Sequence, residues 1–263
     1  MVIIILSVAV VVTGKLHWNN KIQATVNNAQ VNGASELEST KATKEKTEDK
    51  RKLEEVERYS KNLPNELKYK LTSAVQDGNP LSFIIAGSDA TANEPNAWPM
   101  MLKEELEDTY GSDVLQVEII EIADKTSTQV VEEELYREII DLSPDILLFE
   151  PFIRYDNWNV VPFEKRLENI TQILSAIKNE TPNVTILLQP ANPLHKATRY
   201  PNEVNKLEEY AKENEYIYIN HWSAWPDHQS DAIADYLSEA APNEKGNEVW
   251  AEYLSNYFIS DGN

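Results

Sequence analysis

The stretch Leu81-Ser82-Phe83-Ile84-Ile85-Ala86-Gly87-Ser88-Asp89 decides the fold. Five of the six residues before Gly87 are apolar, and this run stops at the glycine, which a serine and an aspartate follow. A continuous apolar run that ends in glycine is typical of a buried parallel strand that enters a tight turn. Ligands of open α/β sheets bind just beyond the carboxyl ends of such strands, so Ser88 and Asp89 are predicted to lie at a site. A polar turn without a function is the alternative.

Strands and helices alternate along the rest of the chain. The segment at 114–122 contains an alternating stretch, with Val117 and Ile119 on one face and Glu118 on the other, which favours a position nearer an edge. The segments at 145–152 and 184–189 are mostly apolar and should be central. Five strands with crossover helices predict an α/β fold with a parallel sheet covered on both faces. The predicted strands cover 81–86, 114–122, 145–152, 184–189 and 216–220, and the predicted helices cover 98–110, 127–142, 163–179, 202–214, 230–238 and 245–258.

The amino-terminal part has a different composition from the rest. Residues 1–12 are almost wholly apolar, 19–35 are rich in Asn, Ala, Val and Gln, and 36–58 are helix-forming with mixed charge. About 20 apolar residues are needed to span a bilayer, so the first run is short for a span. An apolar helix of a cytosolic protein is the alternative to a membrane anchor. We expect a signal anchor at 1–18, a polar to charged stalk at 19–60 and an extracytoplasmic domain at 61–263, which predicts a single-pass protein of the cell membrane.

Charge and composition exclude several classes of partner. The chain has 24 Lys and Arg against 44 Asp and Glu, a formal net charge of −20, and the excess of acid falls after residue 60. Such an acidic domain repels nucleic acid and anionic lipid. No cysteine is present, which excludes disulfides, thiolate metal sites and a cysteine nucleophile. No phosphate loop, dinucleotide fingerprint or His-x-x-x-His spacing occurs, so we expect neither a cofactor nor a metal.

Polar residues follow every predicted strand, and these residues should meet along one edge of the sheet. They include serine, aspartate, asparagine, glutamine and histidine side chains. Tryptophans also lie in or near these segments and suit either stacking on sugar rings or packing in the core. The polar segments are 87–89, 124–127, 150–157, 189–193 and 220–228, and the tryptophans are Trp98, Trp158, Trp222 and Trp225.

From about residue 81 to residue 258 the chain resembles the SGNH/GDSL hydrolase family. The likeness is carried by Ile85-Ala86-Gly87-Ser88-Asp89-Ala90-Thr91 with Trp98-Pro99, by 144–152 with Asp156-Asn157, and by 242–252, where Pro-Asn precedes Lys-Gly. It is greatest to a membrane-anchored branch found in Gram-positive bacilli. The resemblance implies a flavodoxin-like, three-layer α/β/α sandwich. It also implies hydrolysis of carboxylic (acyl) esters by a serine in active members, on an acylated small molecule, glycan or lipid of the cell envelope.

The catalytic blocks of that family are altered in this chain. The family's Gly-Asp-Ser order is here Gly87-Ser88-Asp89, so Asp89 stands at the usual position of the nucleophile. The family's Asp-x-x-His is here Ser238-Glu239-Ala240-Ala241, so Ala241 stands where the base would be. A serine needs an oriented base to become a nucleophile, so two interpretations stay open.

In the first interpretation the chain is a serine ester hydrolase with a relocated base, and Asp89 points away from the cleft or caps the next segment. In the second, it is a catalytically inactive SGNH-like domain that binds an envelope glycan or lipid. His221 could also be a core or capping residue, and His228 is a second choice for the base. The first interpretation assigns catalysis to Ser88, His221 and Asp156, and oxyanion or substrate binding to Lys125, Thr126, Asn157 and Trp222.

Overall fold

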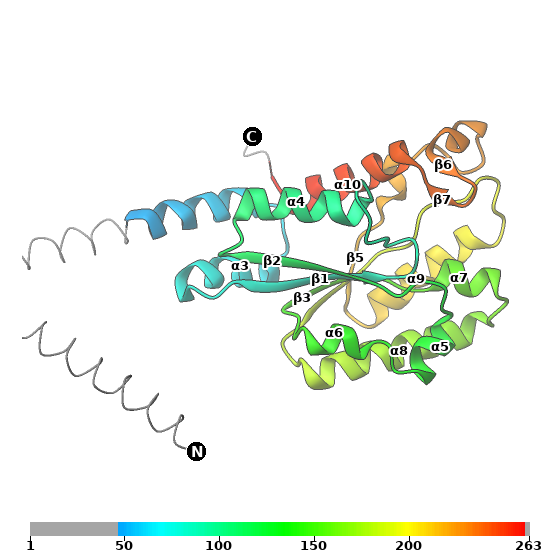
Figure 1. Ribbon diagram of the computed structural model, residues 1–263, viewed down its shortest axis with the longest axis horizontal. Helices are drawn as coiled ribbons and strands as arrows, with labels where there is room; N and C mark the ends of the chain where they lie inside the picture. Colours follow the sequence, from blue (N-terminus) through cyan, green and yellow to red (C-terminus); the bar gives the residue numbers. More distant parts are fainter. Residues whose placement is uncertain (1–46, 261–263) are drawn as a thin grey trace, which may run out of the picture. The chain divides into compact units, whose positions relative to one another are not determined.

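The computed structural model describes residues 47–260, and a five-stranded parallel sheet forms the centre of the domain (Figure 1). Its strand order is β2-β1-β3-β4-β5, which confirms the predicted parallel sheet, with the second strand of the chain at an edge. The strands are β1 (Leu81–Gly87), β2 (Leu115–Glu121), β3 (Ile146–Glu150), β4 (Thr185–Leu188) and β5 (Ile217–Tyr218).

Helices cover both faces of the sheet and complete a three-layer α/β/α sandwich (Figure 1). Helices α4 (Trp98–Tyr110) and α10 (Glu244–Phe258) pack side by side on one face. The opposite face carries the crossover helices that follow β2, β3 and β4, as right-handed connections require for this strand order. These are α5 (Ser127–Glu132), α6 (Arg137–Asp141), α8 (Phe163–Glu180) and α9 (Tyr200–Glu213), while α3 (Asn65–Asp77) precedes β1 and the short α7 (Ile153–Trp158) follows β3.

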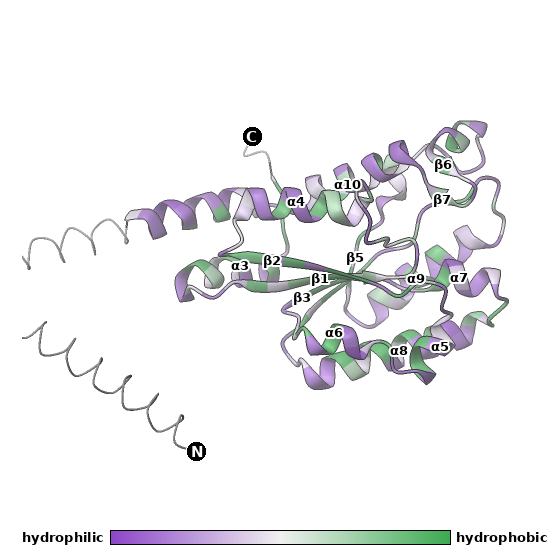
Figure 2. Cartoon of the chain, in the orientation of Figure 1, coloured by the Kyte–Doolittle hydropathy of each residue, from purple (hydrophilic) through white to green (hydrophobic). Residues whose placement is uncertain are grey.

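The core lies between the sheet and these helices. Ile84 and Ile85 of β1 and Leu147 and Leu148 of β3 are all fully buried, as expected for the central strands of a parallel sheet. Colouring by hydropathy shows apolar residues along the strands, and polar ones on the outer sides of the helices (Figure 2). The two ends of the domain meet, because the Ser260 N–H donates to the Tyr59 carbonyl oxygen at 2.7 Å.

Two predicted helices differ from the structure. The predicted helix at 127–142 is broken into α5 and α6, because Glu134 adopts a left-handed conformation with φ 52° between them. The segment predicted as a helix at 230–238 is instead the 3₁₀ turn η2 (Asp231–Tyr236), followed by a small antiparallel hairpin of β6 (Leu237–Ser238) and β7 (Ala241–Pro242).

The predicted anchor at 1–18 and most of the predicted stalk lie outside the described residues. Residues 47–59 form a helix, whose Val56 is buried against the core. Within residues 47–260, every helix is too short or too polar to cross a bilayer.

Candidate functional site

The turn after β1 directs Ser88 inward, away from solvent. Ser88 is completely buried, and its Oγ donates a hydrogen bond to Glu150 Oε2 at 2.7 Å. The Ser88 backbone N–H donates to the same oxygen at 2.9 Å, and Thr91 Oγ1 donates at 3.3 Å. Ser88 is therefore held against the last residue of β3 and does not face a substrate, which contradicts its predicted role as the nucleophile.

Glu150 is a buried carboxyl group beneath the turn that carries Ser88 and Asp89. Burial raises its pKa to about 8, although the hydrogen bonds from Ser88 and the charge of Arg154 favour the ionised form. Its second oxygen, Oε1, has no hydrogen-bond partner within the part of the chain that the structure describes. Glu150 therefore acts as the internal acceptor that fixes the direction of Ser88.

His221 is a core residue, and both of its ring nitrogens bond partners other than Ser88. Its Nδ1 accepts a hydrogen bond from Trp225 Nε1 at 2.9 Å, so its Nε2 carries the proton that is donated to the Pro190 carbonyl oxygen at 2.9 Å. The ring also stacks on Trp250 with 4.1 Å between centroids, and burial lowers its pKa to about 3. Since both nitrogens are engaged, the prediction that His221 takes a proton from Ser88 is contradicted by the geometry.

Four other residues predicted for the site hold loops in place. Asp156 is buried and its Oδ1 accepts a hydrogen bond from the Ser127 backbone N–H at 2.7 Å, which joins the loops after β2 and β3. Thr126 caps α5, and Lys125 forms an ion pair with Glu133 at 2.6 Å. Trp222 donates from Nε1 to the Ala191 carbonyl oxygen at 2.7 Å. None of the four lines the two cavities described below.

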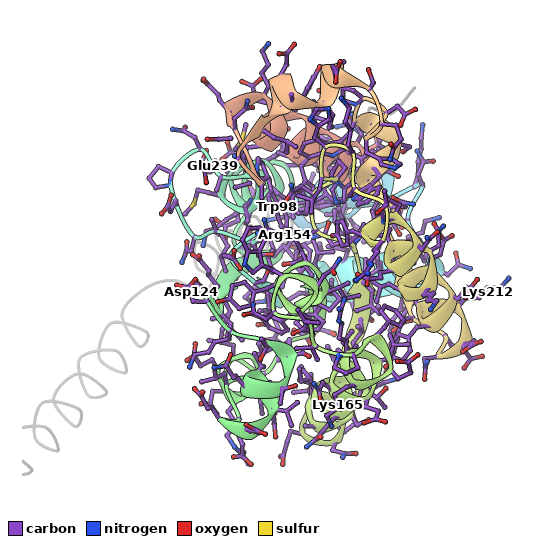
Figure 3. All side chains as sticks on the ribbon, turned by 90° about the vertical axis from the view of Figure 1, so that its right-hand side faces the viewer. Trp98, Asp124, Arg154, Lys165, Lys212 and Glu239 are labelled. Carbon is purple, nitrogen blue, oxygen red and sulfur yellow. The ribbon has the colours of Figure 1, made fainter. Side chains whose placement is uncertain are left out.

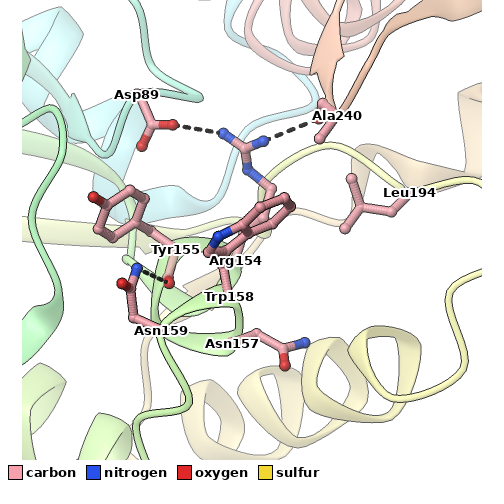
Figure 4. A pocket seen from close by; sticks show the side chains of 8 residues that line it. All are labelled: Asp89, Arg154, Tyr155, Asn157, Trp158, Asn159, Leu194 and Ala240. Atoms are coloured by element: carbon pink, nitrogen blue, oxygen red, sulfur yellow. Dashed lines mark hydrogen bonds and ion pairs between the residues drawn. The ribbon is translucent and has the colours of Figure 1, made fainter.

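A cavity of about 470 Å³ opens at the carboxyl edge of the sheet, and we call it the cleft (Figure 4). Arg154 of α7 crosses it, with Nη2 3.0 Å from Asp89 Oδ2 and Nη1 2.9 Å from the Ala240 carbonyl oxygen. Asp89 thus lines the cleft, contrary to the expectation that it points away, and Asn157 is also among the lining residues. The lining residues are Asp89, Arg154, Tyr155, Asn157, Trp158, Asn159, Leu194 and Ala240.

A second cavity of about 560 Å³ shares Asp89 with the cleft. Ala241, at the position where the resemblance places a histidine base, lines this second cavity together with Asn243 and Asn247. Figure 3 faces this end of the domain and shows Arg154 near its centre. Asp89 is therefore the residue that both cavities can present to a ligand.

Among the described residues, no histidine lines either cavity. His195 interacts with Asp231 at 3.1 Å, and His228 lies 3.6 Å from Asp227. Residues 47–260 also contain no group of three or more His, Asp or Glu side chains placed to hold a metal ion. The cleft can therefore form hydrogen bonds through a carboxylate, a guanidinium and amides, but it lacks a serine and histidine pair.

Sequence reasoning missed the roles of Arg154 and Glu150. Glu150 ends an otherwise apolar strand, and a carboxyl group at the end of a buried run is the signal that could have marked it. Arg154 lies within a polar segment after the third strand, but its partners Asp89 and Ala240 are 65 and 86 residues away in sequence. Such long-range pairs are not visible in a single sequence.

Solved structures share this fold with the chain. Neither a protein-family model nor a curated protein matches it. A G-D-S-L family protein from Desulfitobacterium hafniense has a TM-score of 0.54 and 18% identity over 67% of this chain and 99% of its own. A GDSL-like protein from Parabacteroides merdae has a TM-score of 0.57 and 14% identity, over 68% of this chain and 95% of its own. A catalytic mutant of Axe2, an acetylxylan esterase from Geobacillus stearothermophilus, has a TM-score of 0.50 and 14% identity, over 68% and 94%.

Proposed function

We propose that this chain is an SGNH-type domain of the cell envelope whose cleft binds an acylated glycan or lipid without using a serine nucleophile. The observation that carries the proposal is the ion pair between Arg154 and Asp89, 3.0 Å apart, at the position where the family resemblance places the nucleophile. The cleft, at about 470 Å³, has the size of a small-molecule site.

The arrangement of Ser88 argues against serine catalysis. A general base must lie about 2.6–3.2 Å from the proton that it takes, and the nucleophile must also reach the substrate. Ser88 has a carboxyl group within that distance, but it is completely buried and so cannot reach an ester in the cleft. Asp89 does reach the cleft, but Arg154 holds its carboxylate and neutralises its charge.

Ester hydrolysis is the second candidate function. It is supported by the fold that the chain shares with an acetylxylan esterase and by the position of Asp89, which lines both cavities. A carboxylate in such a place could accept a proton from water and direct that water to an ester carbonyl. This mechanism needs no serine nucleophile, so it depends on Asp89 and not on Ser88.

The location at the envelope rests on the amino-terminal sequence. The apolar run at 1–12, followed by a polar segment, supports attachment to a membrane, and the resemblance to a membrane-anchored branch of Gram-positive bacilli supports a domain on its outer side. Protease added to intact cells should then remove the domain, while the same protein in the cytosolic fraction would contradict the proposal.

Turnover of p-nitrophenyl acetate by the purified protein tests the binding function against hydrolysis. We expect wild type, Ser88→Ala and Asp89→Asn to give the same background rate. Turnover that is lost in Asp89→Asn and kept in Ser88→Ala would favour the second candidate. Turnover that is lost in Ser88→Ala would restore the serine nucleophile and overturn the proposal.

A gain-of-function variant gives the matched positive control. Asp89→Ser, Ser238→Asp and Ala241→His together restore the residues that the family resemblance places at these positions. Asp89 and Ala241 line the same cavity, so the new serine and histidine would lie along one surface. Esterase activity in the triple variant, but not in the Asp89→Ser single variant, is expected if the cleft retains the binding geometry of the family.

A further inference from the structure

Of the four tryptophans in or near the polar segments, Trp158 alone presents its ring to the cleft. Trp98 is fully buried and stacks on Trp250 with 4.5 Å between centroids. Trp222 and Trp225 donate from Nε1 to the Ala191 carbonyl oxygen and to His221. Trp158 lines the cleft, is 81% exposed, and makes no side-chain hydrogen bond within residues 47–260 (Figure 4).

Hydrogen bonds fix the backbone on both sides of Trp158, whose ring is in solvent. The chain turns sharply after α7, where the Asn159 side chain donates to the Tyr155 carbonyl oxygen at 2.9 Å and the Val161 N–H donates to the Asp156 carbonyl oxygen at 3.0 Å. Val160 adopts φ 58°, a left-handed conformation that is rare for a β-branched residue, and it is 80% exposed. Such strain persists only where the surroundings enforce it, and it is concentrated at functional sites.

The side chains around Trp158 suit a sugar better than an acyl chain. Asn157, Asn159 and Asp89 bring amides and a carboxylate to the same cavity, whereas Leu194 and Ala240 are its only aliphatic lining residues among those described. A sugar ring presents C–H groups on one face, which pack on an aromatic ring, and hydroxyl groups at its edge, which bond amides and carboxylates. An acyl chain would offer no hydrogen-bond partner to the Asn157 amide or to Asp89 Oδ1, which has no partner within the described residues, and this costs free energy.

The charge of the cleft favours a neutral ligand. Arg154 is the cation of the cleft, and both of its terminal nitrogens are already bound to Asp89 and Ala240. The chain as a whole carries a net charge of −20, which repels anionic polymers. We infer that the cleft recognises a neutral sugar ring of an acylated glycan, with Trp158 as the stacking surface. This inference rests on the proposed binding function.

Isothermal titration calorimetry of the full chain tests the inference with three neutral glycans: penta-N-acetylchitopentaose, acetylated xylo-oligosaccharide and cellopentaose. We expect at least one acylated glycan to bind, and Trp158→Ala to weaken its binding at least tenfold. Trp158→Phe keeps an aromatic face and should stay within a few-fold of wild type. Tyr69→Ala is the matched control, because Tyr69 is also exposed, at 73%, and lies on α3 outside the cleft.

The remaining outcomes separate the stacking role from the proposed function. Glycan binding that is unchanged in Trp158→Ala but lost in Asp89→Ala would overturn the stacking role and leave the proposed function in place. Binding of no glycan in the panel overturns the inference. Trp158-dependent binding to phosphatidylcholine vesicles, with no glycan bound, would assign the exposed ring to a lipid surface instead. Circular dichroism of each variant verifies that the fold is intact.

Discussion

The Arg154 guanidinium joins the Asp89 carboxylate to the Ala240 carbonyl oxygen, at 3.0 Å and 2.9 Å respectively. Asn192 donates to the same carbonyl oxygen at 3.0 Å. These bonds tie together the loop after β1, helix α7 and the tip of the hairpin formed by β6 and β7. The charge of Asp89 therefore serves the architecture of the cleft.

Replacing Arg154 should weaken this connection measurably. Arg154→Ala leaves the Asp89 carboxylate without its cation, and hydrogen bonds to charged groups contribute about 1.5–3 kcal/mol each. We expect the free energy of unfolding to fall by about 1.5–3 kcal/mol in total for the two bonds, because Asp89 is about one-third exposed and water compensates part of the loss. Urea denaturation of wild type, Arg154→Ala and Arg154→Lys measures it, and Arg154→Lys should be intermediate because an ammonium group keeps the charge but cannot copy the forked geometry. Equal urea midpoints for the three proteins would contradict the structural role.

Glu150 should make the domain less stable as the pH rises. Its pKa is raised from 4.5 to about 8 in the folded state, so between these values the folded chain keeps a proton that the unfolded chain has lost. Stability from this group is therefore fully present below pH 4.5 and is lost as the pH rises toward 8. Glu150→Gln removes the titration, and urea midpoints near both ends of this window should differ less in the variant than in wild type. If the urea midpoint changes with pH as much in Glu150→Gln as in wild type, Glu150 is not the group that titrates in this window.

His221 should make the domain less stable as the pH falls, whereas Glu150 makes it less stable as the pH rises. Burial lowers its pKa from 6.5 to about 3, so the folded chain binds fewer protons than the unfolded chain between these values. Stability is lost as the pH falls from 6.5 toward 3. His221→Gln loses the stacking on Trp250 and should be less stable throughout, but its loss of stability on acidification should be smaller. A parallel acid profile in variant and wild type would exclude His221 as the titrating group.

The sheet could be predicted from the sequence because each central strand is a local apolar run. The edge position of β2 could be predicted as well, because the alternation of Val117, Glu118 and Ile119 is also a local pattern. The site was harder to predict, because the direction of Ser88 depends on Glu150, which is 62 residues away. His221 looked like a base because it follows a strand, whereas its ring is held by aromatic partners in other elements.

Gly87 fixes the close approach of the Ser88 turn to β3. A Cβ at this position would overlap Thr91 Oγ1 and lie 2.8 Å from both the backbone oxygen and Oε2 of Glu150. The backbone oxygen belongs to β3, a central strand, so it cannot retreat without disturbing the sheet. Gly87→Ala should therefore lower the free energy of unfolding by at least the 1–3 kcal/mol or so that is typical of overpacked sites.

Gly78→Ala separates this steric effect from the general cost of replacing a glycine. Gly78 has φ 64° at the end of α3, and nothing lies within 4 Å of a Cβ added there. Its replacement should cost only the strain of a left-handed alanine, about 1 kcal/mol. Urea denaturation should thus rank Gly87→Ala as the less stable variant. Because the Gly87 turn also carries Asp89, the same substitution should weaken the glycan binding proposed for the cleft, whereas Gly78→Ala should leave it unchanged. Equal stability of the two variants would mean that the turn can move away from Glu150, and that Glu150 does not fix the direction of Ser88.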